Sequence, residues 1–298
     1  MLPNFNTLVN HKIMFMNKIN HVLFLISLVI LCSCHSKIKE RKDQVYSRHL
    51  QKHVSLTVIS TPVPDNKGDF NLLLLNDGQD ISKMRVREIV DSLYTRNLIR
   101  PLIVVGIDAF DRIQEYGVSG MPDYQGNGAS AEKYAGFVTG ELLPFVKKRA
   151  GVRKFQSITI AGCSLGGLSA FDIAWDNADK IDKVGVFSGS FWLRDKDSRD
   201  SSYSDQKDRL IINKIRASRK RPHLQYWFYA GGNEEKADRD KDGIIDAIDD
   251  TKDLMDLIKT KNVADPGSIT YVEEKEGSHD YASWSYVFPR FLTWAEGK

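Results

Sequence analysis

The pentapeptide at residues 162–166 constrains the fold of this chain more than any other feature, because it has the form G-x-S-x-G with Ser164 at its centre. Residues 157–161 before it are rich in β-branched and apolar side chains and predict a buried strand, while residues 167–171 after it predict a helix. A serine between such a strand and helix lies on a sharp turn that holds its hydroxyl clear of the backbone. The pattern therefore predicts a nucleophile at Ser164, and the alternative is a glycine-rich turn that serves packing alone.

Patterns typical of strands and helices alternate along the rest of the chain. Continuous apolar runs at 70–75 and 102–107 predict strands that are buried on both faces. Helical periodicity is present at 86–98 and 131–149, and the polar residues 195–221 predict an insertion over the sheet. Other predicted elements are strands at 54–60, 184–187, 224–230 and 268–272, and helices at 254–259 and 284–294. This alternation predicts an α/β fold with a mostly parallel central sheet flanked by helices.

A serine hydroxyl needs a neighbouring base before it can act as a nucleophile, and the base needs a partner that fixes its tautomer. In a parallel α/β sheet such residues lie on loops at the carboxyl ends of the strands. Two histidines, His223 and His279, follow Ser164 in the chain. His223 begins a predicted strand, at the wrong end of the sheet, whereas His279 lies in the loop after the last strand, where the base is expected.

The carboxylate partner of the base is expected after the predicted strand 224–230, where Glu234 and Glu235 follow two glycines. Glu234 is the preferred acid because the glycines allow a turn that brings it beneath the imidazole, and Glu235 remains the alternative. The oxyanion of a tetrahedral intermediate needs N–H donors aimed at it. We expect one donor from Leu165, directly after the nucleophile, and one from Gln79, in the loop after the second predicted strand.

Three aromatic residues lie on predicted loops beside these groups, namely Phe191, Trp192 and Trp284. Aromatic rings at such positions stack on a sugar or phenolic ring of a substrate, or they form the wall of a pocket. We therefore expect Phe191, Trp192 and Trp284 as candidates for substrate binding.

Several segments together resemble the putative esterase family of α/β-hydrolases, which includes enterochelin-esterase-like enzymes, feruloyl and acetyl-xylan esterases and, more distantly, the mycolyltransferases. The resemblance implies an α/β-hydrolase fold. It implies Ser164 as nucleophile, His279 as base and a carboxylate after Gly232 as acid. It also implies an oxyanion hole formed by Gln79 and Leu165. The segments that carry the resemblance are 75–79, 104–108, 162–167, 229–234 and 277–279.

The residues and the resemblance together predict a serine-dependent carboxylic ester hydrolase that works through an acyl-enzyme and requires no cofactor for its chemistry. The expected partner is a small-molecule or polysaccharide-linked ester, such as a siderophore, an acetylated or feruloylated polysaccharide, or a small acyl ester. Two alternatives stay open: an acyltransferase with the same triad, and a non-catalytic envelope binding protein on a hydrolase scaffold. Arg112, Glu115 and Tyr116 are expected to brace the loop over the site.

The N-terminal residues 1–34 are predicted to be a signal peptide rather than part of the fold. Residues 21–31 are almost entirely apolar, and two lysines precede them, as in a secretory signal. This apolar run is too short for a comfortable membrane span. A more conventional signal peptide begins at Met16. One interpretation is that translation starts at Met16 and that residues 1–15 come from an incorrectly assigned upstream start codon.

The predicted signal ends in Leu-Cys-Ser-Cys at residues 31–34, which resembles a bacterial lipobox. This resemblance implies cleavage before Cys34 and acyl chains on that cysteine. We therefore expect a protein of the bacterial cell envelope, on the periplasmic or outer-surface side, whose membrane partner is reached through a lipid anchor. The charged residues 35–51 are expected to be a tether, and residues 52–298 are expected to be the esterase domain.

A second pattern lies at residues 238–249. Asp238, Asp240 and Asp242 occupy alternate positions before Gly243, and Asp249 stands at the closing position of an EF-hand-like loop. Carboxylates in this arrangement are the ligands that Ca²⁺ prefers. The pattern predicts a structural calcium site, and the alternative is a solvated acidic loop.

The composition is that of an ordinary globular protein, with 42% hydrophobic and 27% charged residues. The formal net charge of +3 is too small to indicate a nucleic-acid partner, so we expect none. After removal of the signal peptide and acylation of Cys34, Cys163 is left without a disulfide partner.

Overall fold

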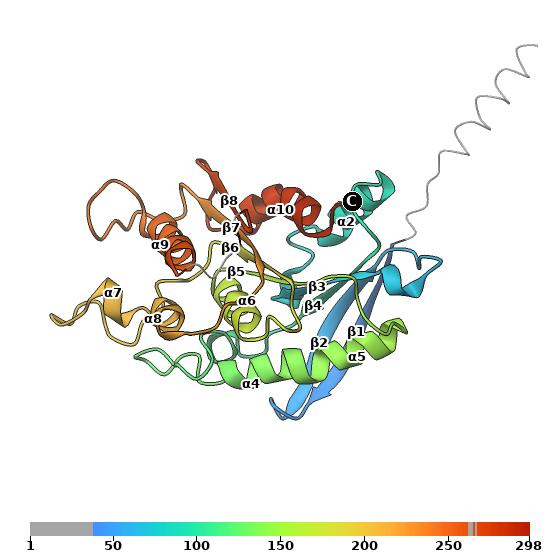
Figure 1. The fold of residues 1–298 in the computed structure, drawn as a ribbon, viewed down its shortest axis with the longest axis horizontal. Helices are drawn as coiled ribbons and strands as arrows, with labels where there is room; N and C mark the ends of the chain where they lie inside the picture. The colour runs from blue at the N-terminus through green and yellow to red at the C-terminus, as the bar shows by residue number, and fades with distance from the viewer. Residues whose placement is uncertain (1–37, 262–264, 266) are drawn as a thin grey trace, which may run out of the picture. The chain divides into compact units, whose positions relative to one another are not determined.

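The computed structural model describes residues 38–261, 265 and 267–298 (Figure 1). The predicted signal peptide at 1–34, its acylated Cys34 and the first residues of the predicted tether lie outside this range. Among the described residues, no helix combines the length and the apolar character that crossing a bilayer requires.

One sheet of eight strands organises the domain, in the order β1-β2-β4-β3-β5-β6-β7-β8. The six strands from β4 to β8 along this order run parallel to one another, and β2 is antiparallel to both β1 and β4. The predicted α/β-hydrolase fold with a mostly parallel sheet is thereby confirmed. The strands are β1 (Lys39–Ser47), β2 (Lys52–Ser60), β3 (Asn71–Asn76), β4 (Leu102–Ile107), β5 (Ile158–Cys163), β6 (Lys183–Phe187), β7 (Gln225–Gly231) and β8 (Ile269–Glu274).

Helices cover both faces of this sheet, as Figure 1 shows. The α-helices are α2 (Val86–Thr95), α3 (Arg112–Glu115), α4 (Ala131–Gly136), α5 (Leu143–Ala150), α6 (Leu165–Asp176), α7 (Asp205–Asp208), α8 (Leu210–Ala217), α9 (Asp246–Thr260) and α10 (Tyr281–Glu296). Two short 3₁₀ helices, η1 (Lys67–Asp69) and η2 (Gly78–Asp80), flank β3, and a π-helical segment, η3 (Phe137–Leu142), joins α4 to α5. The predicted helix at 131–149 is therefore one continuous rod with a π-helical centre.

The apolar run in β3 shows how the sheet builds two cores. Leu72 and Leu74 belong to the cluster that packs under α4, α5 and α6, whereas Leu73 and Leu75 belong to the cluster under α2 and α10. All four leucines are at most 1% exposed. Because neighbouring side chains of a strand point to opposite faces, a strand covered on both sides needs apolar residues at every position. The prediction from the unbroken run is confirmed.

The prediction of a tether at 35–51 was wrong from residue 39 onward. Lys39–Ser47 forms the edge strand β1, paired antiparallel with β2 from Lys39 opposite Ser60 to Ser47 opposite Lys52. Ser47 Oγ also donates to Glu141 Oε2 at 2.7 Å, which fixes the end of the strand to η3. An edge strand with two wet faces carries charged side chains, so it lacks the apolar pattern that identifies interior strands.

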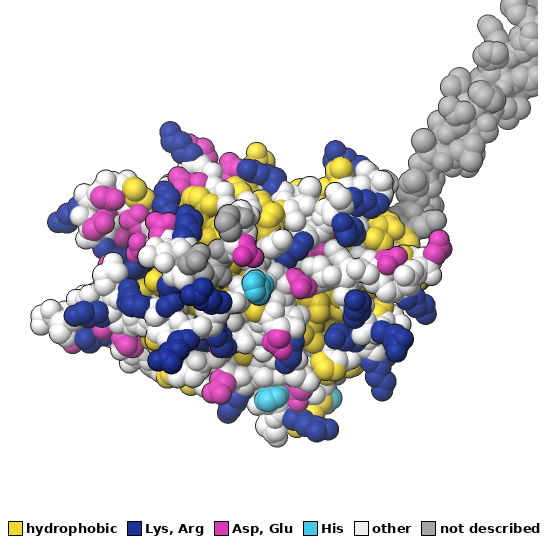
Figure 2. All heavy atoms as spheres, in the orientation of Figure 1, with side chains coloured by type: hydrophobic (Ala, Val, Ile, Leu, Met, Phe, Trp, Pro, Cys, Tyr) yellow, Lys and Arg dark blue, Asp and Glu magenta, His cyan; other side chains and the backbone are white. Residues whose placement is uncertain are grey.

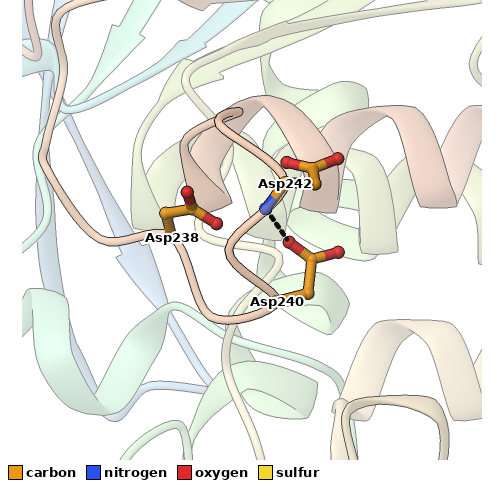
Figure 3. A group of neighbouring side chains, drawn as sticks. All are labelled: Asp238, Asp240 and Asp242. Atoms are coloured by element: carbon orange, nitrogen blue, oxygen red, sulfur yellow. Dashed lines mark hydrogen bonds between the residues drawn. The ribbon is translucent and has the colours of Figure 1, made fainter.

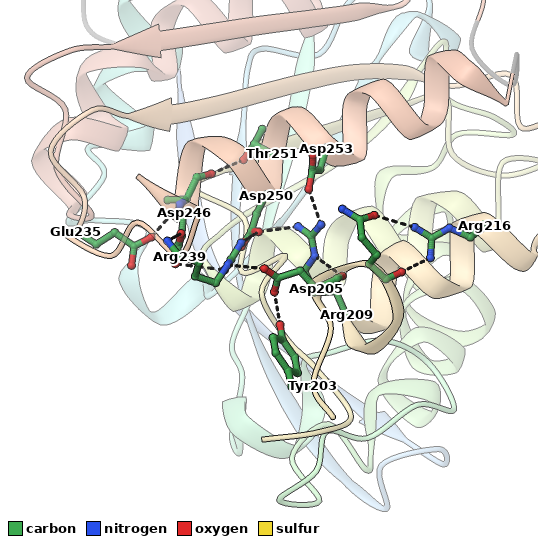
Figure 4. Close-up of polar contacts among 12 residues, drawn as sticks. Tyr203, Asp205, Arg209, Arg216, Glu235, Arg239, Asp246, Asp250, Thr251 and Asp253 are labelled. Atoms are coloured by element: carbon green, nitrogen blue, oxygen red, sulfur yellow. Dashed lines mark hydrogen bonds and ion pairs between the residues drawn. The ribbon is translucent and has the colours of Figure 1, made fainter. Parts of the chain in front are cut away.

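The predicted insertion at 195–221 forms α7 and α8, and a buried group of charges holds it against α9 (Figure 4). Arg209 is 1% exposed, and its Nη1 lies 2.6 Å from Asp250 Oδ1. Arg239 also contacts Asp250, and its Nε lies 3.0 Å from Asp205 Oδ2. The backbone of Arg209 forms a β-bridge with that of Arg194, which connects the start of α8 to the loop after β6. A buried carboxylate needs such partners, because leaving it unpaired costs several kcal/mol.

Candidate active site

Ser164 occupies a strained turn between β5 and α6, as the pentapeptide predicts. Its backbone has φ +56° and ψ −125°, a conformation that non-glycine residues rarely adopt. The turn brings strand and helix so close that a Cβ on Gly162 would lie 2.3 Å from the carbonyl oxygen of Gly166. The Ser164 N–H donates to Phe187 O at 2.8 Å, which ties the turn to the neighbouring strand β6. The strand–turn–helix prediction is confirmed.

Two buried side chains brace the turn from the end of β3 and from α4. The Tyr134 hydroxyl donates to Asn76 Oδ1 at 2.7 Å, and Asn76 Nδ2 donates to Gly166 O at 2.8 Å. Burial raises the pKa of Tyr134 well above its ordinary value, so the phenol keeps its proton and remains a donor. These contacts link α4 and β3 to the backbone of α6 just after Ser164.

His279 and Glu234 form a pair on two later strand-end loops. His279 Nδ1 lies 3.0 Å from Glu234 Oε2, and the side chains are 39% and 2% exposed, respectively. His279 follows β8 and Glu234 follows β7, so both come from carboxyl ends of parallel strands. Glu235, the alternative acid, instead accepts a hydrogen bond from the Ala247 N–H at 2.8 Å. Of the two carboxylates predicted, the structure places Glu234 against the histidine.

Ser188 holds the second oxygen of Glu234, a role that the sequence did not reveal. Its hydroxyl lies 2.6 Å from Glu234 Oε1 and accepts from Trp284 Nε1 at 2.8 Å. The indole N–H can only donate, so the serine hydroxyl proton points to the carboxylate. Ser188 has φ +53° and directly follows Phe187, whose carbonyl accepts the Ser164 N–H. A polar residue at the end of β6 was the available signal, but only the fold shows its partners.

The three aromatic candidates have three different environments. Phe191 is fully buried and packs edge-on against Phe171 and Phe228, so its predicted role in substrate binding was wrong. Trp284 is 5% exposed, and its ring lies edge-to-face on His279 with centroids 5.1 Å apart. It supports the histidine and Ser188 rather than facing solvent. Trp192 is 45% exposed and lines the pocket at Ser164.

A pocket of about 230 Å³ opens at Ser164 and Leu165. Ser164 Oγ lies 3.3 Å from Ser190 Oγ, which stands in the same wall. The rim includes Trp192 and Tyr124, both partly exposed, so a bound molecule meets aromatic surface beside the serine. A cavity of this size accommodates a small group and leaves the rest of a larger molecule outside.

The residues predicted as oxyanion donors lie at the ends of β3 and β5. Leu165 begins α6 and Gln79 lies in η2, and neither backbone N–H donates to an acceptor among the described residues. Asp77 precedes η2 with φ +59°, and its N–H donates to the Tyr116 hydroxyl at 2.9 Å. Arg112 Nε donates to Asp77 Oδ1 at 2.9 Å. Arg112 and Tyr116 thus support this turn, as expected.

The acidic loop after Glu234 is shown in Figure 3. Asp238, Asp240 and Asp242 each offer a carboxylate oxygen, and these oxygens lie within 4.8 Å of one another. Gly243 follows with φ +92°, the left-handed conformation that the pattern requires there. Burial, together with the charges of Asp242 and Asp240, raises the pKa of Asp249 to about 6. The loop concentrates negative charge and could hold a metal ion.

A serine on a strand–helix turn, with an acid–histidine pair on later strand-end loops of a parallel sheet, is the arrangement of an α/β-hydrolase of the serine hydrolase class. Residues 50–295 match the model of the family described as "Putative esterase". The chain therefore belongs to the putative esterase family.

The relatives found agree with this assignment. An uncharacterised protein of Bacillus subtilis, YbbA, is 23% identical over 239 residues, which is 78% of this chain and 88% of YbbA. The enterobactin esterase FES of Shigella flexneri, solved in the presence of enterobactin, aligns with a TM-score of 0.66 and 22% identity over 88% of this chain. This chain spans 60% of the length of that esterase. A ferulic acid esterase aligns with a TM-score of 0.64 and 17% identity over 88% of this chain and 99% of its own.

The strained backbone conformation of Ser164 can be tested by substitution. Ser164→Gly is expected to be about 1 kcal/mol more stable to unfolding than Ser164→Ala, because glycine adopts positive φ without steric cost and alanine does not. Urea denaturation of the two variants measures the difference. Equal stabilities, or a more stable alanine variant, would show that the turn is not strained at this position.

Proposed function

We propose that the protein is a serine-dependent carboxylic ester hydrolase with Ser164, His279 and Glu234 as its triad. The observation that carries the proposal is the contact between His279 Nδ1 and the buried carboxylate of Glu234. With Nδ1 bound to the carboxylate, Nε2 of the imidazole is available to act as a base. Ser164 directly follows β5, and Ser188, whose hydroxyl contacts Glu234, directly follows the neighbouring strand β6.

The proposed reaction proceeds through an acyl-enzyme. Ser164 Oγ attacks the ester carbonyl while His279 takes its proton, and Glu234 stabilises the resulting imidazolium. The N–H groups of Leu165 and Gln79 donate to the oxyanion of the tetrahedral intermediate. His279 then gives the proton to the departing alcohol, and water, activated by the same histidine, hydrolyses the acyl-enzyme.

We propose a small-molecule or polysaccharide-linked ester as the substrate, with Trp192 as a contact in the pocket. Support comes from the aromatic rim at Ser164 and from similar proteins whose names refer to enterobactin and ferulic acid. A panel of siderophore, feruloyl, acetyl-polysaccharide and small acyl esters identifies the class. Trp192→Ala is assayed in parallel, and a selective loss with aromatic or sugar esters supports the contact, whereas a uniform profile contradicts it.

Replacement of the nucleophile provides the first test. Ser164→Ala is expected to reduce hydrolysis of p-nitrophenyl acetate by at least about a thousandfold, because the acyl-enzyme cannot form. The variant is also expected to lose labelling by a fluorophosphonate probe while retaining its melting temperature. Activity or labelling that persists in this variant would contradict the mechanism, and a wild-type protein that never labels would favour a binding protein on a hydrolase scaffold.

A second prediction concerns Ser188 as a positioning residue for Glu234. Ser188→Ala removes a donor to a buried carboxylate, so kcat is expected to fall by about ten- to a hundredfold with little change in KM. The control is Ser285→Ala, which removes another hydroxyl close to Trp284, one that donates to Met84 O at 3.0 Å. Equal kcat values for the two alanine variants would remove Ser188 from the mechanism.

We further propose that the acidic loop binds calcium and orders the chain after Glu234. The three clustered carboxylates and the left-handed glycine support this proposal. Calcium added to chelator-treated protein is expected to raise the melting temperature by several degrees, and Asp240→Asn with Asp242→Asn is expected to abolish the shift. Magnesium serves as the control ion. No calcium-dependent shift in the native protein would end this proposal.

We propose a lipid anchor on Cys34 and a place in the bacterial cell envelope. The lipobox-like residues 31–34 support it. A fatty acid supplied to expressing cells is expected to label the native protein and not the Cys34→Ala variant. Labelling that survives this substitution would contradict the anchor.

A further inference from the structure

The amino ends of the parallel strands carry a concentrated positive charge. Exposed cations lie on β1, on η1, at the end of α5 and in the loop before β5. A Cβ added to Gly151, at the end of α5, would lie 3.9 Å from Lys67 Nζ of η1. Arg149 of α5 pairs with Asp43 of β1, so α5, η1 and β1 share one surface. In Figure 2, dark blue side chains gather at the right of the view, over the end of α5. We call this surface the basic end; its cations are Lys39, Lys67, Lys148, Arg149, Arg153 and Lys154.

The domain as a whole carries no net charge, and it has a second group of exposed cations before β7, at Arg216, Arg219, Lys220 and Arg221. The whole chain has a formal net charge of +3, and residues 1–37 contain three lysines and no acidic residue. Residues 38–298 are therefore neutral in sum, and the excess at the basic end is balanced by acidic surface elsewhere. The acidic residues near these cations include Glu40, Asp43, Asp65 and Asp69. Asp43 is paired with Arg41 and Arg149, and Glu40 is paired with Arg87.

Apolar surface accompanies these cations. A cavity of about 190 Å³ between α5 and the sheet is lined by Phe70, Phe145 and Val63, and cations stand at its rim. Val63 is 63% exposed. A polyanion in water needs charge alone, whereas the surface of a bilayer offers anionic headgroups above an apolar layer. Cations beside exposed apolar groups match the bilayer better.

The topology places the basic end at the amino ends of the parallel strands and Ser164 at their carboxyl ends. Lys39 pairs with Ser60, and Ser60 pairs with Ile103 near the start of β4, so the chain enters the domain at the amino edge. Lys154 precedes β5, and Ser164 follows the last residue of that strand. Six residues of strand at about 3.3 Å each separate the two edges by roughly 20 Å.

We propose that the basic end binds the anionic headgroups of a phospholipid bilayer and so holds the domain with Ser164 facing away from the membrane. The site then meets soluble or polymer-linked esters rather than membrane lipids. The cations of the basic end lie at the same end of the strands as Lys39, the first residue of β1. The proposal does not depend on esterase activity, since binding to vesicles is measured without turnover.

Vesicle binding tests the proposal with a chain that begins at Ile38, since residues 38–298 build the eight-stranded sheet and the two apolar clusters described above. Vesicles of phosphatidylglycerol with phosphatidylcholine are expected to bind this domain at low salt and to release it near 0.5 M NaCl. Vesicles of phosphatidylcholine alone are expected not to bind it. Hydrolysis of a soluble ester is expected to be unchanged on the anionic vesicles.

Matched variants locate the surface. The triple variant Lys148→Gln, Arg153→Gln and Lys154→Gln is expected to weaken vesicle binding about a hundredfold, from the typical contribution of each cation near an anionic surface. The control triple variant Lys207→Gln, Lys236→Gln and Lys275→Gln changes the net charge equally at exposed positions outside the basic end. It is expected to bind as the native domain does.

Three results would overturn the proposal. The first is a native domain that does not bind anionic vesicles at low salt. The second is an equal loss in the two triple variants, which would indicate an effect of net charge alone. The third is binding to a soluble polyanion such as heparin without binding to vesicles, which would assign the surface to a different partner.

Discussion

The close contact between the backbones of Gly162 and Gly166 is the constraint on which the site depends. A Cβ on Gly162 would lie 2.3 Å from the Gly166 carbonyl oxygen, and a Cβ on Gly166 would lie 2.7 Å from Asp77 Oδ2, so both positions require glycine. That approach puts Ser164 in its strained conformation and leaves the N–H of Leu165 free at the start of α6. The bracing by Asn76 and Tyr134 serves to hold this turn, because strain persists only where the surroundings determine it.

The Glu234–His279 pair is supported by Ser188, which follows the neighbouring strand β6. Ser188 Oγ accepts a hydrogen bond from Trp284 Nε1 and contacts Glu234 Oε1. The rings of Trp284 and His279 form a T-shaped contact. One tryptophan therefore fixes both members of the pair, through a hydrogen bond on one side and ring packing on the other. Hydrogen bonds to a buried carboxylate favour a single orientation, which leaves one of its oxygens for the imidazole.

The sequence predicted those parts of the site that follow from strand ends. Ser164, Glu234 and His279 each follow a predicted strand, so strand prediction and chain order were enough to place all three on loops at the carboxyl ends of parallel strands and to pair Glu234 with His279. The sequence could not predict which side chains of a loop are buried and which face the pocket. Phe191 and Trp192 are adjacent on one loop, yet Phe191 is in the core and Trp192 lines the pocket. The loop is held by a backbone bridge between Arg194 and Arg209, which no local pattern in the sequence indicates. The edge strand β1 was missed because its polar residues lack an apolar period.

A crystal structure of the protein after reaction with a methyl phosphonate ester would test the proposed site most directly. The phosphorus is expected on Ser164 Oγ, with the phosphonyl oxygen about 3 Å from the backbone nitrogens of Leu165 and Gln79 and with His279 beside the esterified oxygen. Phosphonate bound to another residue, or a phosphonyl oxygen that faces solvent away from both amides, would contradict the assignment of nucleophile and oxyanion hole.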